Sequence, residues 1–212
     1  MRQFDFVIFD FNGTLQNDRH VVYDLCVVRP FELLGLPAPT LETYLNEITH
    51  EFMPFYWRHG VPRDVSQKQW DTIICKCMEG EEPAGLFDDA REAVQIVVEN
   101  IGHPALISGW PGPGLSEALV YHGLVGYFSM VLGGVTDKAR EFRVCAEQAQ
   151  IPPERIIVVG DMVDDAAAAV AVGMQVCIIP RGLHSEQRIL AQHANIPTMR
   201  VLPDLASFAQ LC

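Results

Sequence analysis

The chain has 212 residues, of which 49% are hydrophobic and 20% are charged, and its formal net charge is −12. This composition excludes an intrinsically disordered protein, which would combine low hydrophobicity with high charge. The acidic balance argues against nucleic acid as a partner, because phosphate backbones recruit Lys and Arg. No apolar run reaches the roughly 18 residues that a membrane-spanning helix needs, so no membrane contact is expected.

The N-terminus and the cysteines indicate a cytoplasmic protein. The first residues lack the long apolar stretch and cleavage site of a signal peptide. Six cysteines are scattered along the chain, and Cys75 and Cys77 form a C-x-C pair without the second cluster that a zinc site needs. Reduced thiols and a cytoplasmic location are therefore expected. The pattern leaves open whether the protein is a monomer or a homodimer.

The first predicted strand covers residues 4–9, which are mostly apolar and β-favouring, and it ends at Asp10. Runs of this kind are typical of parallel strands that are buried on both faces. Similar runs follow at residues 105–107, 130–132, 156–159 and 176–179. Amphipathic patterns between the runs predict helices over residues 88–101, 115–122, 138–150 and 164–172.

Strict alternation of strands and helices predicts an α/β fold with a doubly wound, Rossmann-like parallel sheet and helices on both faces. Residues 1–14 and 84–212 would form this core. Residues 15–83 interrupt the alternation, and they are rich in aromatic residues and prolines. They are expected to form a small, mostly α-helical domain inserted after the first strand.

Three polar residues, Asp10, Ser108 and Asp161, each follow a predicted strand directly. Ligands of parallel α/β sheets bind beyond the carboxyl ends of the strands. We therefore expect these three residues to share one site.

Asp10 opens the segment Asp10-Phe11-Asn12-Gly13-Thr14. A carboxylate held at the end of a buried strand can act as a nucleophile and form an acyl-phosphate. The alternative is a plain turn, because Asn-Gly is a strong turn signal by itself.

The segment from Gly160 to Asp165 carries three carboxylates directly after a predicted strand. Mg²⁺ prefers such oxygen-rich sites, with few carboxylates and substrate phosphate as ligands. The alternative is helix capping, with Asp161 as the N-cap and the other acids in the first turn.

Two further segments are weaker signals alone. The Ser108 hydroxyl and the backbone amides around Gly109 could hold a phosphate oxygen, although an ordinary loop serine fits equally well. Lys138 is one of three lysines in the chain and could neutralise a nucleophile and a phosphate, although a solvated surface lysine is the simpler interpretation.

Taken together, the Asp-x-Asn-Gly-Thr segment, Ser108, Lys138 and the Gly-Asp-x-x-x-Asp segment resemble the haloacid dehalogenase superfamily. The resemblance is to its phosphatase-like branch, with a helical cap inserted after the first strand. It implies a Mg²⁺-dependent hydrolase that acts on a small phosphorylated metabolite, a phosphate monoester, through an aspartyl-phosphate.

The resemblance also implies roles for individual residues. Asp10 would be the nucleophile and a metal ligand, and Asn12 would offer its backbone carbonyl to the metal. Asp161 would be a direct ligand and Asp165 a supporting one, with Asp164 as a further candidate. The implied substrate contacts are Thr14, Ser108, Gly109 and Lys138, of which Lys138 also counts as catalytic.

Asn12 departs from the family pattern, which has Asp at this position to protonate the leaving group and then to deprotonate the attacking water. An amide can do neither. Loss of general acid–base catalysis typically costs about 10²–10⁴ in rate. We therefore expect a slowed phosphatase.

Several alternatives stay open. Another group could replace the acid, and the cap histidines His20, His50 and His59 are candidates. Asn could also be an engineered replacement of Asp. The reaction could need no acid, as in halide release from a 2-haloacid, although dehalogenases usually carry an aromatic residue here and need no Mg²⁺. Finally, the protein could bind a phosphorylated ligand without turnover.

Phosphonate hydrolysis is less favoured, because the only cap lysines, Lys68 and Lys76, lie outside the first predicted cap helix. The substrate itself stays open. Candidates for its pocket are Arg29, His50, Tyr56, Trp57 and Arg58, although Tyr56-Trp57-Arg58 is more simply cap core followed by a surface arginine.

Overall fold

The computed structural model describes residues 3–49, 51–193, 195–196 and 198–212. Within them, one parallel sheet has the strand order β3-β2-β1-β4-β5-β6. The strands are β1 (Phe6–Phe9), β2 (Ala105–Ile107), β3 (Met130–Leu132), β4 (Ile156–Gly160), β5 (Gln175–Ile178) and β6 (Met199–Val201). The predicted doubly wound α/β fold is confirmed.

The burial of the strands explains why their sequences are apolar runs rather than alternating patterns. All residues of β2 and β4 are buried, as a sheet covered on both faces requires. Strand β6 was not predicted. It is a short edge strand that contains Arg200, so it gives no apolar run.

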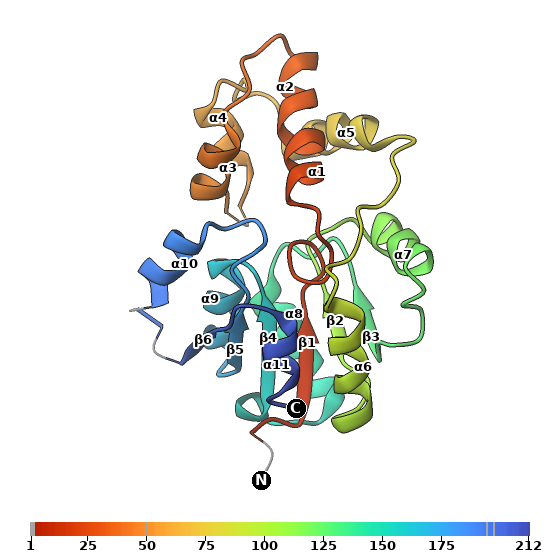
Figure 1. Cartoon of the computed structure of the whole chain (residues 1–212). Coiled ribbons are helices and arrows are strands. Elements are labelled where there is room, and N and C mark those ends of the chain that lie inside the picture. Colours follow the sequence, from red (N-terminus) through yellow and green to blue (C-terminus); the bar gives the residue numbers. More distant parts are fainter. Residues whose placement is uncertain (1–2, 50, 194, 197) are drawn as a thin grey trace.

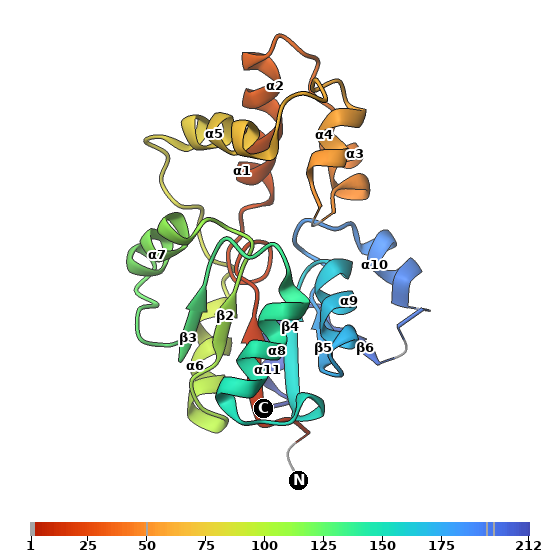
Figure 2. The ribbon, with the colours of Figure 1, turned by 180° about the vertical axis from the view of Figure 1, so that it is seen from behind.

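Helices cover both faces of the sheet (Figures 1 and 2). On one face, α6 (Ala90–Asn100), α7 (Gly112–Tyr121) and α11 (Leu205–Ala209) pack through residues such as Val94, Leu115 and Phe208. On the other face, α8 (Lys138–Ala149), α9 (Val163–Ala171) and α10 (Glu186–His193) pack through Phe142, Ala166 and Ile189. A 3₁₀ turn, η2 (Pro153–Arg155), precedes β4. Each of the four predicted helices is present, with ends that differ by up to three residues.

The segment between β1 and α6 forms a helical lobe, defined here as residues 19–78. It holds α1 (Arg19–Tyr23), a π-helical turn η1 (Asp24–Val28), α2 (Arg29–Leu33), α3 (Leu41–Glu47), α4 (Met53–Arg58) and α5 (Gln67–Met78). In Figure 1 the lobe stands above the carboxyl ends of the strands. It has its own aromatic cluster, in which Trp70 packs against Phe31 and Tyr56. The domain boundaries given above stay a prediction.

Two connecting segments join the lobe to the core and lie side by side. Asn17 N donates to Gly85 O at 2.8 Å, and Phe87 N donates to Leu15 O at 2.9 Å. The Gln16 side chain adds a hydrogen bond from Nε2 to Ala84 O at 2.9 Å. The outgoing and returning chains therefore form a paired connection next to the end of β1.

His184, in the loop after β5, attaches the lobe to the core a second time. Its Nδ1 accepts from Val163 N at 3.0 Å, and its Nε2 lies 3.0 Å from Ile48 O. Because Ile48 O is an acceptor, Nε2 carries the proton. Burial lowers the pKa of His184 to about 4, so the ring is neutral at physiological pH. Arg188 reinforces this contact through a 2.6 Å bond from Nη1 to Ile48 O.

In the part of the chain that the structure describes, no helix combines the length and the apolar character needed to span a membrane.

Candidate active site

The site lies where the order of the strands reverses. From β1 the chain passes to β2 on one side, and β4 later pairs with β1 on the other side. Such a switch point opens a crevice at the carboxyl ends of the strands. Asp10 directly follows β1, and Asp161 directly follows β4, so both line the crevice from adjacent strands.

The loop after β1 is shaped by backbone contacts around Asp10 and Gly13. Phe11 N donates to Asp10 Oδ1 at 2.7 Å, which fixes the carboxylate. Gly13 has φ of +68°, and a Cβ atom there would lie 2.5 Å from Asp161 Oδ2. Only glycine suits both constraints. The turn places Thr14 beneath the site, where its hydroxyl donates to Asp161 Oδ1 at 3.4 Å.

Three buried carboxylates and one lysine meet at this crevice. One oxygen each of Asp10, Asp161 and Asp165 lies within 4.8 Å of the others. Lys138, the first residue of α8, places Nζ 2.8 Å from Asp10 Oδ2 and 2.5 Å from Asp165 Oδ1. Asp165 also accepts from Met162 N at 3.2 Å, which orients it at the start of α9. The predicted cluster is therefore assembled from β1, α8, β4 and α9.

The charges of this cluster do not balance. Burial raises the pKa of Asp10, and it raises the pKa of Asp161 further, with the neighbouring carboxylates adding to the effect. Burial alone would lower the pKa of Lys138, but Asp10 and Asp165 outweigh it and raise the value. Three carboxylates face one ammonium group. This donor set fits a hard divalent cation such as Mg²⁺, which prefers carboxylate oxygens.

Asp164 lies outside the cluster that contains the other two acids of its segment, Asp161 and Asp165. Its Oδ2 lies 3.5 Å from His184 Nε2, and it is outside the group of three carboxylates. The alternative of Asp161 as the N-cap is not what the structure has, because Met162 occupies that position.

Ser108 and Asn12 form the neutral part of the site. Ser108 Oγ donates to Asn12 Oδ1 at 3.3 Å and accepts from Trp110 N at 3.2 Å. Gly109 follows Ser108 and lines the cavity between the core and the lobe that is described below. Thr14 does not line this cavity. Its role as a substrate contact stays a prediction, as do the catalytic, binding and metal-ligand roles of the other site residues.

Asp18 is a buried carboxylate that sequence reasoning missed. Asn12 Nδ2 donates to Asp18 Oδ2 in a short contact and to Gln16 Oε1 at 3.3 Å. Gly13 N donates to Asp18 Oδ1 at 2.8 Å. Burial raises the pKa of Asp18 to about 7. No pattern marked this residue, because the contact depends on how the loop closes.

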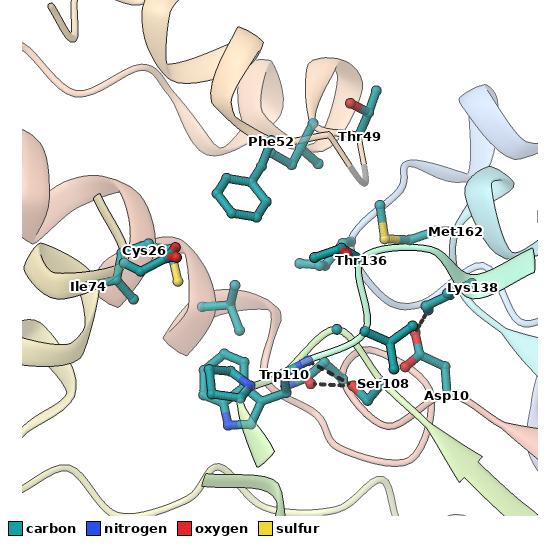
Figure 3. A pocket seen from close by; sticks show the side chains of 18 of the residues that line it. Asp10, Cys26, Thr49, Phe52, Ile74, Ser108, Trp110, Thr136, Lys138 and Met162 are labelled. Atoms are coloured by element: carbon teal, nitrogen blue, oxygen red, sulfur yellow. Dashed lines mark hydrogen bonds and ion pairs between the residues drawn. The ribbon is translucent and has the colours of Figure 1, made fainter. Parts of the chain in front are cut away.

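A cavity of about 440 Å³ lies between the core and the lobe. Asp10, Ser108 and Lys138 line its core side, and Phe52 and Ile74 of the lobe face them (Figure 3). Pockets of this size hold small molecules. The cavity is thus the space in which a ligand can reach Asp10.

Most of the cap residues singled out from the sequence lie away from this cavity. Of the five pocket candidates, Tyr56 lines it, whereas Arg29, Trp57 and Arg58 do not, and His50 lies outside the described residues. Arg58 instead pairs with Glu47 on the surface. The remaining candidates that do not line the cavity are His20, His59, Lys68 and Lys76.

The chain matches the haloacid dehalogenase-like hydrolase family over residues 4–173. No curated protein matches it in sequence. Among solved structures, a protein from Haemophilus somnus 129PT described as a predicted phosphoglycolate phosphatase has a TM-score of 0.78 and 18% identity, with 100% of this chain and 99% of that chain covered.

A haloacid dehalogenase-like family protein from Streptococcus pneumoniae has a TM-score of 0.76 and 18% identity, with 100% of both chains covered. CbbY from Rhodobacter sphaeroides, solved in complex with phosphate, has a TM-score of 0.73 and 16% identity, with 97% of this chain and 96% of that chain covered. At these identities the structural similarity shows the shared fold. The family match covers most of the chain, including β1 and β4 with the carboxylates that follow them, and on that match the chain belongs to the haloacid dehalogenase-like hydrolases.

Proposed function

We propose that this protein is a Mg²⁺-dependent phosphatase that hydrolyses a small phosphate monoester through an aspartyl-phosphate on Asp10. The observation that carries the proposal is the position of Asp10. It lies at the switch point of the sheet, beside Asp161, Asp165 and Lys138, and it faces a cavity of about 440 Å³.

The proposed reaction has two steps. An oxygen of Asp10 attacks phosphorus, and the bond between phosphorus and the ester oxygen breaks. The alkoxide leaves with the electron pair and takes a proton from water, which leaves hydroxide. A second water then attacks the phosphorus of the aspartyl-phosphate, and the bond between phosphorus and the Asp10 oxygen breaks. This step releases inorganic phosphate, restores the Asp10 carboxylate and passes the proton of the attacking water to the hydroxide.

Asp10, Asp161 and Asp165, together with the backbone carbonyl of Asn12, would hold Mg²⁺. When bound, the ion would offset negative charge on the phosphate. Lys138 holds Asp10 through the 2.8 Å ion pair, so the carboxylate keeps one orientation toward the cavity. Ser108 and the backbone of Gly109 would bind a phosphate oxygen from the other side.

The proposed site lacks an efficient group for the proton transfers. The Asn12 side chain has no acidic proton, and its amide already donates to Asp18 and Gln16 while its oxygen accepts from Ser108. Neither His20 nor His59 lines the cavity. The slow rate expected from the sequence is therefore part of the proposal.

Both polar atoms of the Asn12 amide already have hydrogen-bond partners. This favours a second candidate function, which is binding of a phosphorylated ligand without turnover. In that case Ser108 and Lys138 would bind the phosphate, Asp10 would serve only as a metal ligand, and no phosphate would be released.

A cytoplasmic location also remains part of the proposal. All six cysteines are free thiols in the structure, which fits a reducing compartment.

The test compares phosphate release from p-nitrophenyl phosphate by the full chain and by Asp10→Ala, with Mg²⁺ and with EDTA. The proposal expects Mg²⁺-dependent release that falls more than about 10³-fold in the variant. The exposed carboxylate Asp88 provides a matched control, Asp88→Ala, which keeps the activity. Equal release by Asp10→Ala and the unchanged protein would disprove the role of Asp10. Tight phosphate binding without release would favour the second candidate.

A further inference from the structure

Helix α5 of the lobe has three distinct rows of side chains. One row packs into the lobe through Trp70, which is fully buried. The residues of the second row are exposed to solvent: Lys68, Thr72 and Lys76. The residues of the third row line the cavity: Asp71, Ile74, Cys75 and Met78. Their spacing at i, i+3, i+4 and i+7 places them on one side of the helix.

The third row is mostly apolar. Ile74 packs against the edge of the aromatic cluster that holds Trp70, and Asp71 and Cys75 are exposed to solvent where they line the cavity. Phe52 of the lobe extends this apolar surface, and Trp110 closes it from the core side (Figure 3). Apolar side chains that face a cavity gain free energy when an apolar ligand covers them. The cavity wall opposite Asp10 therefore suits hydrocarbon.

The charges around the cavity favour a ligand with one phosphate. Lys138 is the only Lys or Arg among the described residues that line it, and its ammonium group already contacts Asp10 and Asp165. The charged residue that the described part of the lobe contributes is Asp71, an acid. A second phosphate would lose its hydration in an apolar space that offers it no cation.

We infer that the substrate of this site is a monophosphate ester of an apolar alcohol, with a long alkyl or aryl group lying along Phe52, Ile74 and Trp110. The inference rests on the proposed phosphatase function, because Asp10 and Ser108 define where the phosphate binds. Bisphosphates and the phosphates of small polar alcohols are poor substrates.

The first experiment compares ethyl phosphate, n-hexyl phosphate and 1,6-hexanediol bisphosphate with Mg²⁺. All three release a primary alkoxide, so differences in kcat/KM report how the organic group binds. Hexyl phosphate should exceed ethyl phosphate by roughly fourfold for each methylene that becomes buried. The bisphosphate should be at least about tenfold worse than hexyl phosphate. Equal use of hexyl and ethyl phosphate, or preference for the bisphosphate, would overturn the inference.

The second experiment moves a positive charge into the cavity. Ile74→Arg places a cation on the third row, whereas the matched control Thr72→Arg places it on the exposed row of the same helix. The ratio of hexyl phosphate to bisphosphate activity should fall at least about tenfold in Ile74→Arg and stay unchanged in Thr72→Arg. Thermal unfolding checks that both variants fold. If Ile74→Arg does not, Asp71→Asn should lower the ratio in the same direction. A ratio that changes equally in Ile74→Arg and Thr72→Arg would contradict the proposed position of the organic group.

Calorimetry separates this inference from the proposed function. n-Hexylphosphonate and ethylphosphonate, which contain no ester bond, are titrated into the full chain with Mg²⁺. Tighter binding of the hexyl compound supports the inference even if no ester is hydrolysed, and that absence of hydrolysis would then overturn the phosphatase proposal. Hydrolysis of p-nitrophenyl phosphate with equal binding of both phosphonates would overturn the inference and leave the proposed function standing.

Discussion

The two sides of the cavity differ most in their charged groups. The core side carries buried charges, with Asp10, Asp165 and Lys138 in direct contact. The lobe side carries aromatic and aliphatic groups and a single carboxylate among its described lining residues. In the proposed function the reacting groups come from the core, whereas most of the groups that select the substrate come from the lobe, with Trp110 of the core as the exception. The charged groups of the core would define the position of a phosphate, and the lobe together with Trp110 would define what can be attached to it.

The largest expected effect concerns the buried ion pairs on the core side. Lys138→Met leaves three buried carboxylates without an ammonium group, and breaking buried ion pairs costs about 3–5 kcal/mol. We expect this loss in the free energy of unfolding in urea, measured in EDTA. The matched control Lys76→Met removes an exposed lysine of the lobe and should change stability by less than about 0.5 kcal/mol. If both variants unfold at the same urea concentration, the core side is not organised by its charges.

The next effect concerns the contact between Asn12 and Asp18. In Asn12→Asp, a second carboxylate would lie against Asp18. Repulsion between the two like charges would disturb the position and the pKa of the new acid. We expect the single variant to gain less than tenfold in phosphate release, and the double variant Asn12→Asp/Asp18→Asn to gain about 10²-fold.

The control for this prediction is Asp18→Asn alone, which supplies no acid at position 12 and should bring no gain. Steady-state rates with p-nitrophenyl phosphate check the four proteins. A full gain in Asn12→Asp alone would show that Asp18 does not interfere.

Stability should depend on pH and Mg²⁺ through the core side. Burial raises the pKa of Asp10 and Asp161, and it raises that of Asp18 from 3.8 to about 7. An acid whose pKa is higher in the folded than in the unfolded protein stabilises the fold. This stabilisation is fully present at a pH below the unfolded pKa, and it is lost as the pH rises through the folded pKa. The metal-free protein should therefore lose stability between pH 3.8 and about 7.

Mg²⁺ binds the ionised carboxylates, so it should restore stability at the upper end of that range. The expected gain is about 2.7 kcal/mol when its concentration is 100 times Kd. Urea unfolding at about pH 5 and about pH 8, with EDTA or Mg²⁺, measures both effects. Asp161→Asn should remove most of the gain from Mg²⁺. A gain from Mg²⁺ that survives in Asp161→Asn would place the ion elsewhere.

The smallest effect concerns the contact that joins the two sides. His184→Leu removes the hydrogen bonds to Val163 N and Ile48 O. Val163 N then loses its acceptor, at a cost of about 1–3 kcal/mol, whereas Ile48 O keeps its bond from Arg188. Because the lobe is held less firmly, KM should rise while kcat changes little. Ser185→Ala, which removes a more exposed contact to Asn46, is the control. A fall in kcat without a change in KM would mean that His184 supports the core side instead.

The sequence by itself predicted the core and its carboxylates. Apolar runs followed by Asp10, Ser108 and Asp161 are readable because burial on both faces of a parallel sheet imposes an apolar strand, and the sheet aligns the strand ends. Lys138 and Asp165 were identified as site residues only because the order of the four segments along the chain resembles that of the family. Most of the site residues follow predicted strands, so the positions of these strands along the chain also predicted the position of the site.

The tertiary structure alone decided the contacts of Asp18 and the inner surface of the lobe. Asp18 meets Asn12 because the loop turns back at Gly13. Asn-Gly predicts a turn, but it does not tell which side chain the turn brings against Asn12. Among the described pocket candidates taken from the lobe, only Tyr56 lines the cavity, and Trp57 and Arg58 fit the simpler interpretation of lobe core followed by a surface arginine. An amphipathic pattern tells which residues of a helix share a face, but α5 has one face on the lobe core and another on the cavity. Only the packing of the lobe over the sheet distinguishes the two, because both faces are apolar.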